Sequence, residues 1–250
     1  MMNMNTITHA VSTANRRAEA LFLSAWATSA IWVGTLAFSL ALVVSSRCRR
    51  LAITKMWATF ALSVANVQLR VCGAERLDRP PFIFVINHTS HFDVPVLLAA
   101  IPCAARFMAD DTLFSLSIIG KRLRGLGHIP VPLRRSPIQR ATSVRTALAA
   151  LQEGMSIIIF PEGGRTRRGV SDFHHGATYL AARSGRPLVP VALRGTRSVM
   201  PFGAATIRSG SSVQVLIAEF ITVSLSTAES WRSITALVRD RVAHLVNGTD

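Results

Sequence analysis

A histidine and an aspartate separated by a short polar stretch are the first residues whose types could do chemistry together. His88 follows the apolar run Phe82–Ile86, which has the composition of a buried strand, and Asp93 opens the next apolar segment. A histidine has a near-neutral pKa, and an adjacent carboxylate can fix its tautomer and stabilise the imidazolium, so the two would form a general base. On a continuous helix they would lie about 140° apart, so they can meet only if Thr89–Phe92 forms a turn. A surface turn with a solvated histidine and a helix-capping aspartate fits the same residues.

A second candidate stretch is the glycine- and arginine-rich loop that follows the strand-like run Ser156–Phe160. From Pro161 onward it reads P-E-G-G-R-T-R-R. The adjacent glycines Gly163 and Gly164 let backbone N–H groups approach an anion closely. Three arginines add charge-assisted donors: Arg165, Arg167 and Arg168. The pattern is typical of a phosphate-holding loop, and an ordinary glycine-rich turn with solvated arginines is the alternative.

Two further segments place arginines near strand ends. Gly125–Arg135 contains a strand that runs into paired arginines, at the edge of the sheet where ligands of α/β folds usually bind. In Arg186–Arg197 the apolar run Val189–Val191 includes a proline, which favours an edge strand or a pocket wall. A plain core strand remains the alternative for this run.

Several other kinds of site are not predicted. The motifs G-x-S-x-G, H-E-x-x-H, G-x-x-x-x-G-K-[ST] and G-x-G-x-x-G do not occur in the sequence. His88, His91 and Asp93 could bind a metal, but only His174–His175 offers further ligands, so no metal site is expected. The three cysteines are scattered without a C-x-x-C, which argues against a disulfide framework and suits a reducing compartment.

The charge of the chain is strongly positive. It has 28 lysines and arginines against 13 acidic residues, a net charge of +15, and only Lys55 and Lys121 are lysines. Arginine grips phosphate and carboxylate bidentately. Anionic lipid headgroups, phosphorylated substrates and nucleic acid are therefore candidate partners. Nucleic acid is not favoured, because a single tyrosine offers little for base stacking.

The N-terminal part predicts a membrane-associated segment. Residues 1–20 are expected to be disordered, and Leu21–Ser45 follows without a charged residue. A helix of that length would extend about 37 Å, against about 30 Å for the hydrocarbon core of a bilayer. A buried core helix is the competing interpretation, because serines and threonines dilute the apolar character.

An amphipathic helix is expected next, over Leu51–Arg70. Together, residues 21–70 then form a helical hairpin attached to the membrane. The arginines after the first helix predict that the rest of the chain lies on the cytoplasmic side of a cell inner membrane, although Arg16–Arg17 compete for that side.

From residue 71 the pattern alternates between strand-like and helix-like runs. This predicts one α/β domain, 71–250, with a single mixed, mainly parallel sheet flanked by helices. The strand-like runs are Phe82–Ile86, His128–Val131, Ser156–Phe160, Leu188–Ala192 and Val213–Ala218. The helix-like runs are 93–101, 112–124, 138–153, 174–185 and 227–246.

Four segments, in order along the chain, resemble motifs of the glycerolipid acyltransferase family, which includes the 1-acyl-glycerol-3-phosphate (lysophosphatidate) acyltransferases. Asn87–Asp93 matches the motif N-H-x-x-x-x-D throughout. Phe160–Arg165 is similar to F-P-E-G-T-R, with Gly164 in place of threonine. Leu188–Ala192 is similar to the V-P-V segment. The resemblance spans roughly residues 50–247.

The fourth segment, Gly127–Val131, resembles a motif that leads to an arginine. That arginine comes one place later than the usual spacing. Both Arg134 and Arg135 are therefore candidates for its role.

The resemblance implies transfer of an acyl group from acyl-CoA or acyl carrier protein to a lyso-phospholipid, giving phosphatidate, with no cofactor and no covalent acyl-enzyme. His88 would be the general base and Asp93 would orient it. Residues implied to bind the substrate are Asn87, Arg134, Glu162, Gly163 and Arg165. Glu162 is expected to orient an arginine or a glycerol hydroxyl, since a carboxylate is a poor neighbour for phosphate.

Two alternatives remain open. One is acylation of another lyso-lipid, such as a lyso-ornithine lipid, whose carboxylate would meet the arginines; the missing threonine at Gly164 leaves the acceptor undecided. The other is a membrane-tethered basic protein that binds anionic lipid or nucleic acid without catalysis.

Overall fold

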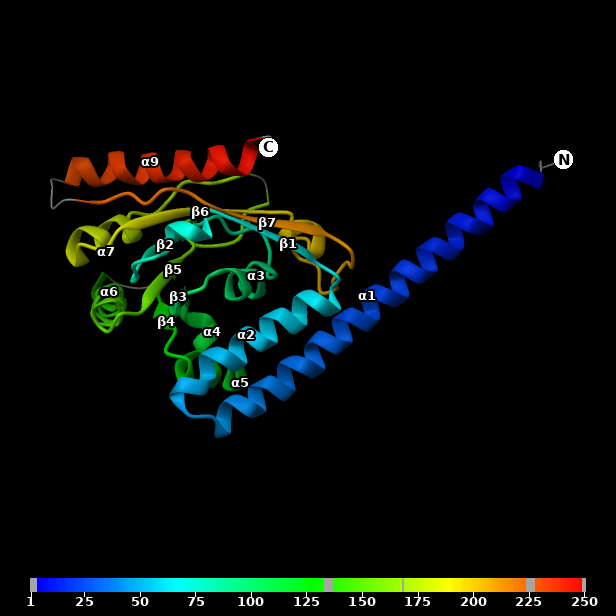
Figure 1. Ribbon diagram of the computed structural model, residues 1–250, viewed down its shortest axis with the longest axis horizontal. Coiled ribbons are helices and arrows are strands. Elements are labelled where there is room, and N and C mark those ends of the chain that lie inside the picture. The colour runs from blue at the N-terminus through cyan, green and yellow to red at the C-terminus, as the bar shows by residue number, and fades with distance from the viewer. Residues whose placement is uncertain (1–3, 133–136, 168, 224–227, 249–250) are drawn as a thin grey trace.

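The structure is a computed structural model that describes residues 4–132, 137–167, 169–223 and 228–248 (Figure 1). Its core is a seven-stranded sheet in the order β1-β7-β6-β2-β5-β3-β4. The strands are β1 (Gln68–Cys72), β2 (Ile83–Ile86), β3 (Ala105–Asp110), β4 (Ile129–Val131), β5 (Ser156–Ile159), β6 (Leu188–Arg194) and β7 (Ser212–Ile217). All neighbours are parallel except β6 and β7. The predicted mixed, mainly parallel sheet is therefore confirmed.

Helices cover both faces of this sheet. They are α1 (Met4–Val44), α2 (Arg47–Val64), α3 (Asp93–Ala100), α4 (Asp111–Ser115), α5 (Ser117–Gly125), α6 (Pro137–Gln152), α7 (Gly176–Ser184), α8 (Thr196–Val199) and α9 (Ala228–Asn247). Side chains alternate along β2, so Phe84 and Ile86 pack toward α2 and α3, while Ile83 and Val85 pack toward α6, α7 and α9 (Figure 1). Burial on both faces explains why the strand is continuously apolar.

Two strands and one break were not predicted from the sequence. β1 lies at an edge and is half-exposed, and β3 carries charged side chains, so neither forms an apolar run. Because β1 begins at Gln68, the sheet starts before residue 71. The helix expected over 112–124 is divided into α4 and α5, because Leu116 has extended backbone.

The proline in β6 was expected to favour an edge or a pocket wall, and the structure places the strand inside the sheet. β6 lies between β7 and β2. The carbonyl of Pro190 accepts a hydrogen bond from the Ala218 N–H at 3.0 Å, and the antiparallel pairing with β7 begins one residue later, at Val191. Antiparallel pairing on this side resumes only at the isolated bridge between Leu188 and Ile221. The missing N–H of the proline therefore falls where the pairing is interrupted, as is usual for a proline within a sheet.

The N-terminal helices form a hairpin with other bounds than expected. The second helix was expected to run to Arg70, but α2 ends at Val64 and residues 68–70 belong to β1. α1 and α2 lie side by side (Figure 1), with the Trp57 Nε1–H donating to Thr35 Oγ1 at 3.0 Å and the rings of Phe38 and Phe60 5.9 Å apart. α1 begins at Met4, so residues 4–20 are helical, in contrast to the disorder expected for them. They extend the apolar helix without a break.

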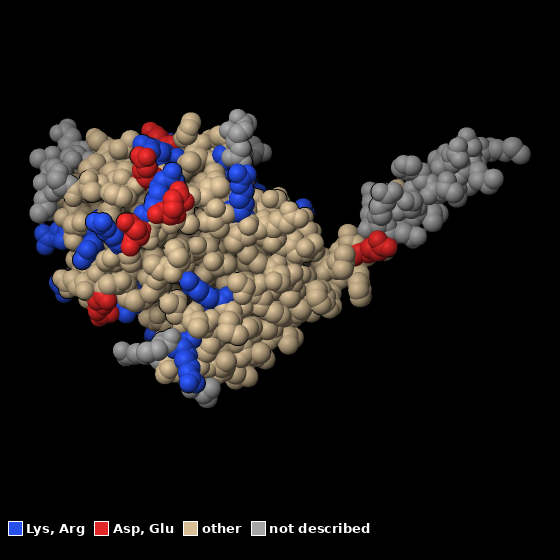
Figure 2. Space-filling model, in the orientation of Figure 1, with Lys and Arg blue, Asp and Glu red and all other residues tan. Residues whose placement is uncertain are grey.

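Much of α1 is exposed. The segment Ala18–Leu42 is long and apolar enough to cross a membrane, and only 11% of its most apolar stretch is buried. It is therefore not a buried core helix. The large side chains that it exposes are Leu21, Phe22, Leu23, Trp26, Trp32, Val33, Leu36 and Leu40. In Figure 2 few charged side chains lie in the right-hand part of the molecule, toward α1. Most of them lie over the left-hand part.

A glycine at the end of β6 tests this architecture. Gly195 has φ +85°, and a Cβ there would clash with the Ser212 carbonyl oxygen of β7. We expect Gly195→Ala to lower the free energy of unfolding by about 1–2 kcal/mol for the left-handed backbone and by about 1–3 kcal/mol more for the clash. Urea unfolding in detergent measures this.

The matched control is Gly154→Ala. Gly154 has φ +83°, but a Cβ there would meet nothing within 4 Å. It should show only the backbone cost. Equal losses in the two variants would contradict close packing between β6 and β7.

Candidate active site

The site is built around a histidine and a carboxylate at the carboxyl end of β2. The chain leaves β2, turns through Thr89–Phe92 and enters α3 at Asp93. This turn places His88 Nδ1 2.7 Å from Asp93 Oδ2. The Asp93 side chain is fully buried and that of His88 is 17% exposed. The side chains that could form a general base are therefore in contact, with one edge of the imidazole open.

Asp93 is held in place by backbone donors. Its Oδ2 also accepts hydrogen bonds from the N–H groups of Thr89 at 2.8 Å and Ser90 at 3.0 Å. Its position in the first turn of α3 favours the negative charge. The carboxylate therefore keeps the proton of the neutral imidazole on Nδ1, and Nε2 is left to accept a proton from a substrate.

The imidazole ring also rests on an aromatic side chain. The rings of His88 and Phe160 are stacked, with centroids 4.0 Å apart and planes inclined by 15°. Phe160 in turn stacks with Phe107 of β3 at 6.2 Å. The hydrogen bond to the Asp93 carboxylate and the stacking on the Phe160 ring together fix the direction of His88 Nε2.

Glu162 binds the backbone of the histidine. Its Oε1 accepts the backbone N–H of His88 at 2.9 Å, and its Oε2 accepts the Ser171 hydroxyl at 3.0 Å. The expectation that Glu162 orients an arginine is not supported in the part of the chain described here, since its bonds go to His88 and Ser171. The carboxylate ties the loop after β5 to the end of β2.

Asn87 belongs to the sheet rather than to the open site. Its side chain is buried, and its amide exchanges two bonds with the backbone of Leu193 in β6, at 3.1 and 2.8 Å. Asn87 thus joins β2 to β6 directly before the histidine. The sequence predicted that Asn87 binds the substrate. Its pairing with Leu193 could not be predicted, because β6 is far from Asn87 along the chain.

The loop after β5 closes over the same turn. The N–H of Thr166 donates to the His88 carbonyl at 2.8 Å. Gly163 has φ +72°, and a Cβ there would lie 3.1 Å from His174 Nε2, so this position favours glycine. At Gly164 a Cβ would meet nothing within 4 Å. A threonine would therefore fit, and its absence here removes a hydroxyl without any steric cause.

Two arginines of this loop lie over one aromatic ring. The guanidinium carbons of Arg165 and Arg167 are 5.5 and 4.9 Å from the centroid of the Phe202 ring. Burial, and then the charges of Arg165 and His88, lower the pKa of His91. Arg165 directly precedes Thr166, whose N–H bonds the His88 carbonyl, so it lies near the turn of His88 and Asp93. Arg134 and Arg135 lie outside the described residues.

The structure brings together residues that the sequence did not connect. Ser171 and Phe202 have no motif around them, and only the tertiary contacts reveal them. A cavity of about 500 Å³ opens farther along the sheet, near the ends of β3 and β4, with Phe114, Arg124 and Pro130 among its lining residues. None of its lining residues belongs to the centre around His88. Within the described residues, no three His, Cys, Asp or Glu side chains are grouped so as to hold a metal ion.

Comparison with known proteins assigns the chain to a family. A sequence profile of the acyltransferase family matches residues 68–194, which is half of the chain. The chain belongs to the acyltransferase family. The matched range includes β1 to β6 and carries both the turn of His88 and Asp93 and the loop of Glu162 and Arg165.

Relatives of this chain carry the same enzyme name. The 1-acyl-sn-glycerol-3-phosphate acyltransferase LPAT1 of Arabidopsis thaliana is 30% identical over 168 residues, which cover 66% of this chain and 46% of that protein. The chain thus spans about half the length of the plant relatives it matches. The 1-acyl-sn-glycerol-3-phosphate acyltransferase of Borreliella burgdorferi is 27% identical, covering 77% of this chain and 78% of its own length.

A solved structure has the same fold. The crystal structure of the 1-acyl-sn-glycerophosphate acyltransferase PlsC from Thermotoga maritima superposes with a TM-score of 0.72 at 24% identity. The match covers 94% of this acyltransferase and 100% of that chain. It supports the fold.

A second histidine near the site generates a pH prediction. His128 Nδ1 accepts the Phe107 N–H at 3.1 Å, and its ring packs edge-on against Phe107. Burial, and secondly the charge of Arg106, lower the pKa of His128 to about 4. The unfolded chain, with a histidine pKa near 6.5, binds this proton first. Stability should therefore fall as the pH drops from about 6.5 to 4, by up to about 3 kcal/mol.

The test compares the wild type with His128→Asn, which keeps an acceptor near the Nδ1 position but cannot titrate. Urea unfolding at pH 7 and at pH 4.5 should show a smaller acid loss in the variant. An identical acid loss in both proteins would mean that His128 is not buried in its neutral form.

Proposed function

We propose that this acyltransferase transfers an acyl group from a thioester, acyl-CoA or acyl carrier protein, to the free hydroxyl of 1-acyl-glycerol 3-phosphate, giving phosphatidate. The observation that carries the proposal is the 2.7 Å contact between His88 and Asp93 in a chain of this family. The names of its relatives support the acceptor.

In the proposed mechanism His88 acts as the general base. The acceptor hydroxyl donates to Nε2, loses its proton there and attacks the thioester carbonyl carbon. A C–O bond forms, the C–S bond breaks, and the thiolate takes the proton back from the imidazolium. Asp93 stabilises that imidazolium through Nδ1. Glu162 and Asn87 act indirectly, by holding the backbone on either side of the reaction centre.

The acceptor phosphate would bind on the arginine-rich loop. Arg165 lies near the catalytic turn, and Gly163 allows the close backbone turn that an anion-binding loop needs. An arginine at 134 or 135 would complete the site. Partners of the reaction are thus the thioester donor, the lyso-phospholipid and the membrane lipids around it.

A second acceptor deserves a direct comparison because Gly164 stands where the family motif has threonine. The space around Gly164 is open, so a hydroxyl contact is absent rather than replaced. A lyso-ornithine lipid, whose carboxylate would meet the same arginines, is the alternative acceptor.

The exposed apolar helix supports attachment to a membrane. We place α1 in the bilayer surface on the cytoplasmic side of the inner membrane, where its exposed side chains would meet acyl chains. Ser24 and Thr28 of α1 bond the backbone of Ile207, close to the arginine-rich loop. This contact would keep the site next to its lipid substrates.

The first test is activity of purified protein with a labelled acyl-CoA and one acceptor at a time. We expect transfer to lysophosphatidate, and a decrease of kcat by a factor on the order of 10²–10⁴ in His88→Ala, the usual share of general-base catalysis. His244→Ala, at an exposed histidine on α9, is the control and should retain full activity.

Other outcomes discriminate between the alternatives. Transfer only to a lyso-ornithine lipid would change the acceptor and keep the mechanism. No transfer to any acceptor, also with acyl carrier protein as donor, would favour the non-catalytic binding protein. Near-normal turnover in His88→Ala would remove the histidine from its assigned role.

Membrane attachment is tested on the exposed side of α1. Leu36 and Leu40 are 58% and 59% exposed, so changing both to Asp should leave the fold intact. An aspartate costs roughly 2.5–3.5 kcal/mol at the centre of a bilayer and less toward its surface, where we place α1. We expect at least a tenfold loss of binding to phospholipid vesicles in a flotation assay. Leu237→Asp, at a position 48% exposed on α9, should bind like the wild type. Unchanged flotation of the double variant would exclude this face.

A further inference from the structure

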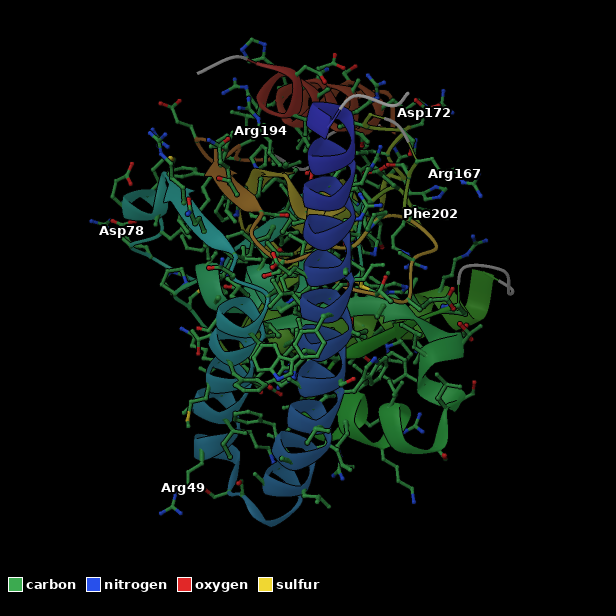
Figure 3. The ribbon with its side chains drawn as sticks, turned by 90° about the vertical axis from the view of Figure 1, so that its right-hand side faces the viewer. Arg49, Asp78, Arg167, Asp172, Arg194 and Phe202 are labelled. Carbon is green, nitrogen blue, oxygen red and sulfur yellow. The ribbon has the colours of Figure 1, made fainter. Side chains whose placement is uncertain are left out.

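Two positively charged side chains share one aromatic ring beside the proposed phosphate site. The guanidinium carbons of Arg165 and Arg167 lie 5.5 and 4.9 Å from the centroid of the Phe202 ring, and Figure 3 shows Arg167 and Phe202 on the same side of the molecule. Among the described residues, neither arginine forms an ion pair with a carboxylate. Without a carboxylate partner among these residues, the charge of both guanidinium groups is available to an anion.

The backbone between the two arginines is fixed. The N–H of Thr166 donates to the His88 carbonyl at 2.8 Å, and the Thr166 carbonyl accepts from Arg197 Nη2 at 2.9 Å. Both arginine side chains therefore emerge from a point that is tied to the catalytic turn.

The segment that carries the Phe202 ring is also held by hydrogen bonds, at Met200 before the ring and at Ile207 after it. The Met200 carbonyl accepts the Ser90 hydroxyl at 2.8 Å, and Ser90 belongs to the turn between the histidine and the aspartate. Farther along, the Ile207 N–H donates to Thr28 Oγ1 at 3.0 Å and its carbonyl accepts the Ser24 hydroxyl at 2.6 Å. The ring is thus held between the catalytic turn and α1.

We propose that Phe202 is a positioning residue that holds Arg165 and Arg167 together as a pair for the phosphate of the acceptor. The inference rests on the proposed function. A phosphate monoester carries close to two negative charges at neutral pH and has three strong acceptor oxygens. Two guanidinium groups therefore satisfy more of it than one. The electron-rich face of the ring attracts both cations and offsets part of their repulsion before the phosphate binds.

Arg167 lies outside the F-P-E-G-T-R motif. The arginine-rich composition of the loop suggested it as a donor, and the tertiary structure adds its contact with Phe202. The effect of Arg165 on the pKa of His91 agrees with a location near the catalytic turn. A phosphate held between the two arginines would keep the acceptor hydroxyl within reach of His88. Phe202 would then determine how well a phosphate-bearing acceptor is bound, and it would take no part in the chemical step.

The experiment compares Phe202→Ala, Phe202→Tyr and Phe220→Ala. Phe202 is 38% exposed and Phe220 is 52% exposed, so neither truncation removes a core side chain, and Phe220→Ala is the matched control. We expect Phe202→Ala to raise the KM for lysophosphatidate about 3- to 30-fold, the range of a cation–π contact. The kcat and the KM for acyl-CoA should stay within about twofold of the wild type. Phe202→Tyr keeps the ring and should restore the low KM.

A double-mutant comparison identifies the partners of the ring. In a protein that already carries Arg165→Ala and Arg167→Ala, Phe202→Ala should have no further effect on the acceptor KM, since the groups it positions are gone. An acceptor KM in Phe202→Ala equal to that in Phe220→Ala would overturn the proposal. A Phe202→Tyr variant as impaired as Phe202→Ala would do the same.

Failure of the proposed function is recognised separately. If the wild type does not acylate lysophosphatidate, binding is measured instead, with lysophosphatidate and monoacylglycerol in detergent micelles. The proposal requires that Phe202→Ala weaken only the binding of the phosphate-bearing lipid. Equal weakening of both lipids, or of neither, would overturn it.

Discussion

The whole arrangement depends on the fixed position of one histidine at the end of β2. The ring of His88 is bound by Asp93 at 2.7 Å and stacked on Phe160. Its backbone N–H is bound by Glu162, and its carbonyl by the N–H of Thr166. In its proposed role as general base, His88 would need its free nitrogen to point at the proton to be removed. Bonds on both the side chain and the backbone remove the rotations that would misdirect it.

The sheet makes these bonds possible. β2 lies between β5 and β6, and its parallel pairing with both brings the carboxyl ends of the three strands to one edge. The turn after β2 therefore meets the loop after β5, although they are far apart in sequence. The antiparallel pairing of β6 with β7 returns the chain across this edge, and the returning segment carries Phe202.

The N-terminal hairpin is joined to the same edge rather than being an independent appendage. α1 packs along α2 through Thr35 and Trp57, and farther toward its start it bonds the backbone of Ile207. The exposed apolar side of α1 and the arginine-rich loop are therefore connected through one short segment. A substrate with an acyl chain and a charged headgroup needs both kinds of surface close together. This packing provides them at a fixed separation.

Which residues could do chemistry, and what class of fold carries them, could be predicted from the sequence. The pair His88 and Asp93, the glycine–arginine loop and the alternating apolar runs are local patterns, because the period of a strand or helix and the chemistry of a turn depend on near neighbours. The charge-free segment near the N-terminus is local in the same sense. Those patterns gave the mainly parallel sheet and the family.

Contacts between segments that are distant in the sequence became visible only in the three-dimensional structure. Asn87 bonds Leu193, and Glu162 bonds the backbone of His88 in place of an arginine, because the strand order sets their neighbours. Pro190 lies in an interior strand because its missing N–H falls where the pairing with the following segment is interrupted. The contact of Phe202 with two arginines has no local signal at all. Partners separated by many residues meet only through the register and order of the sheet, which no window of the sequence contains.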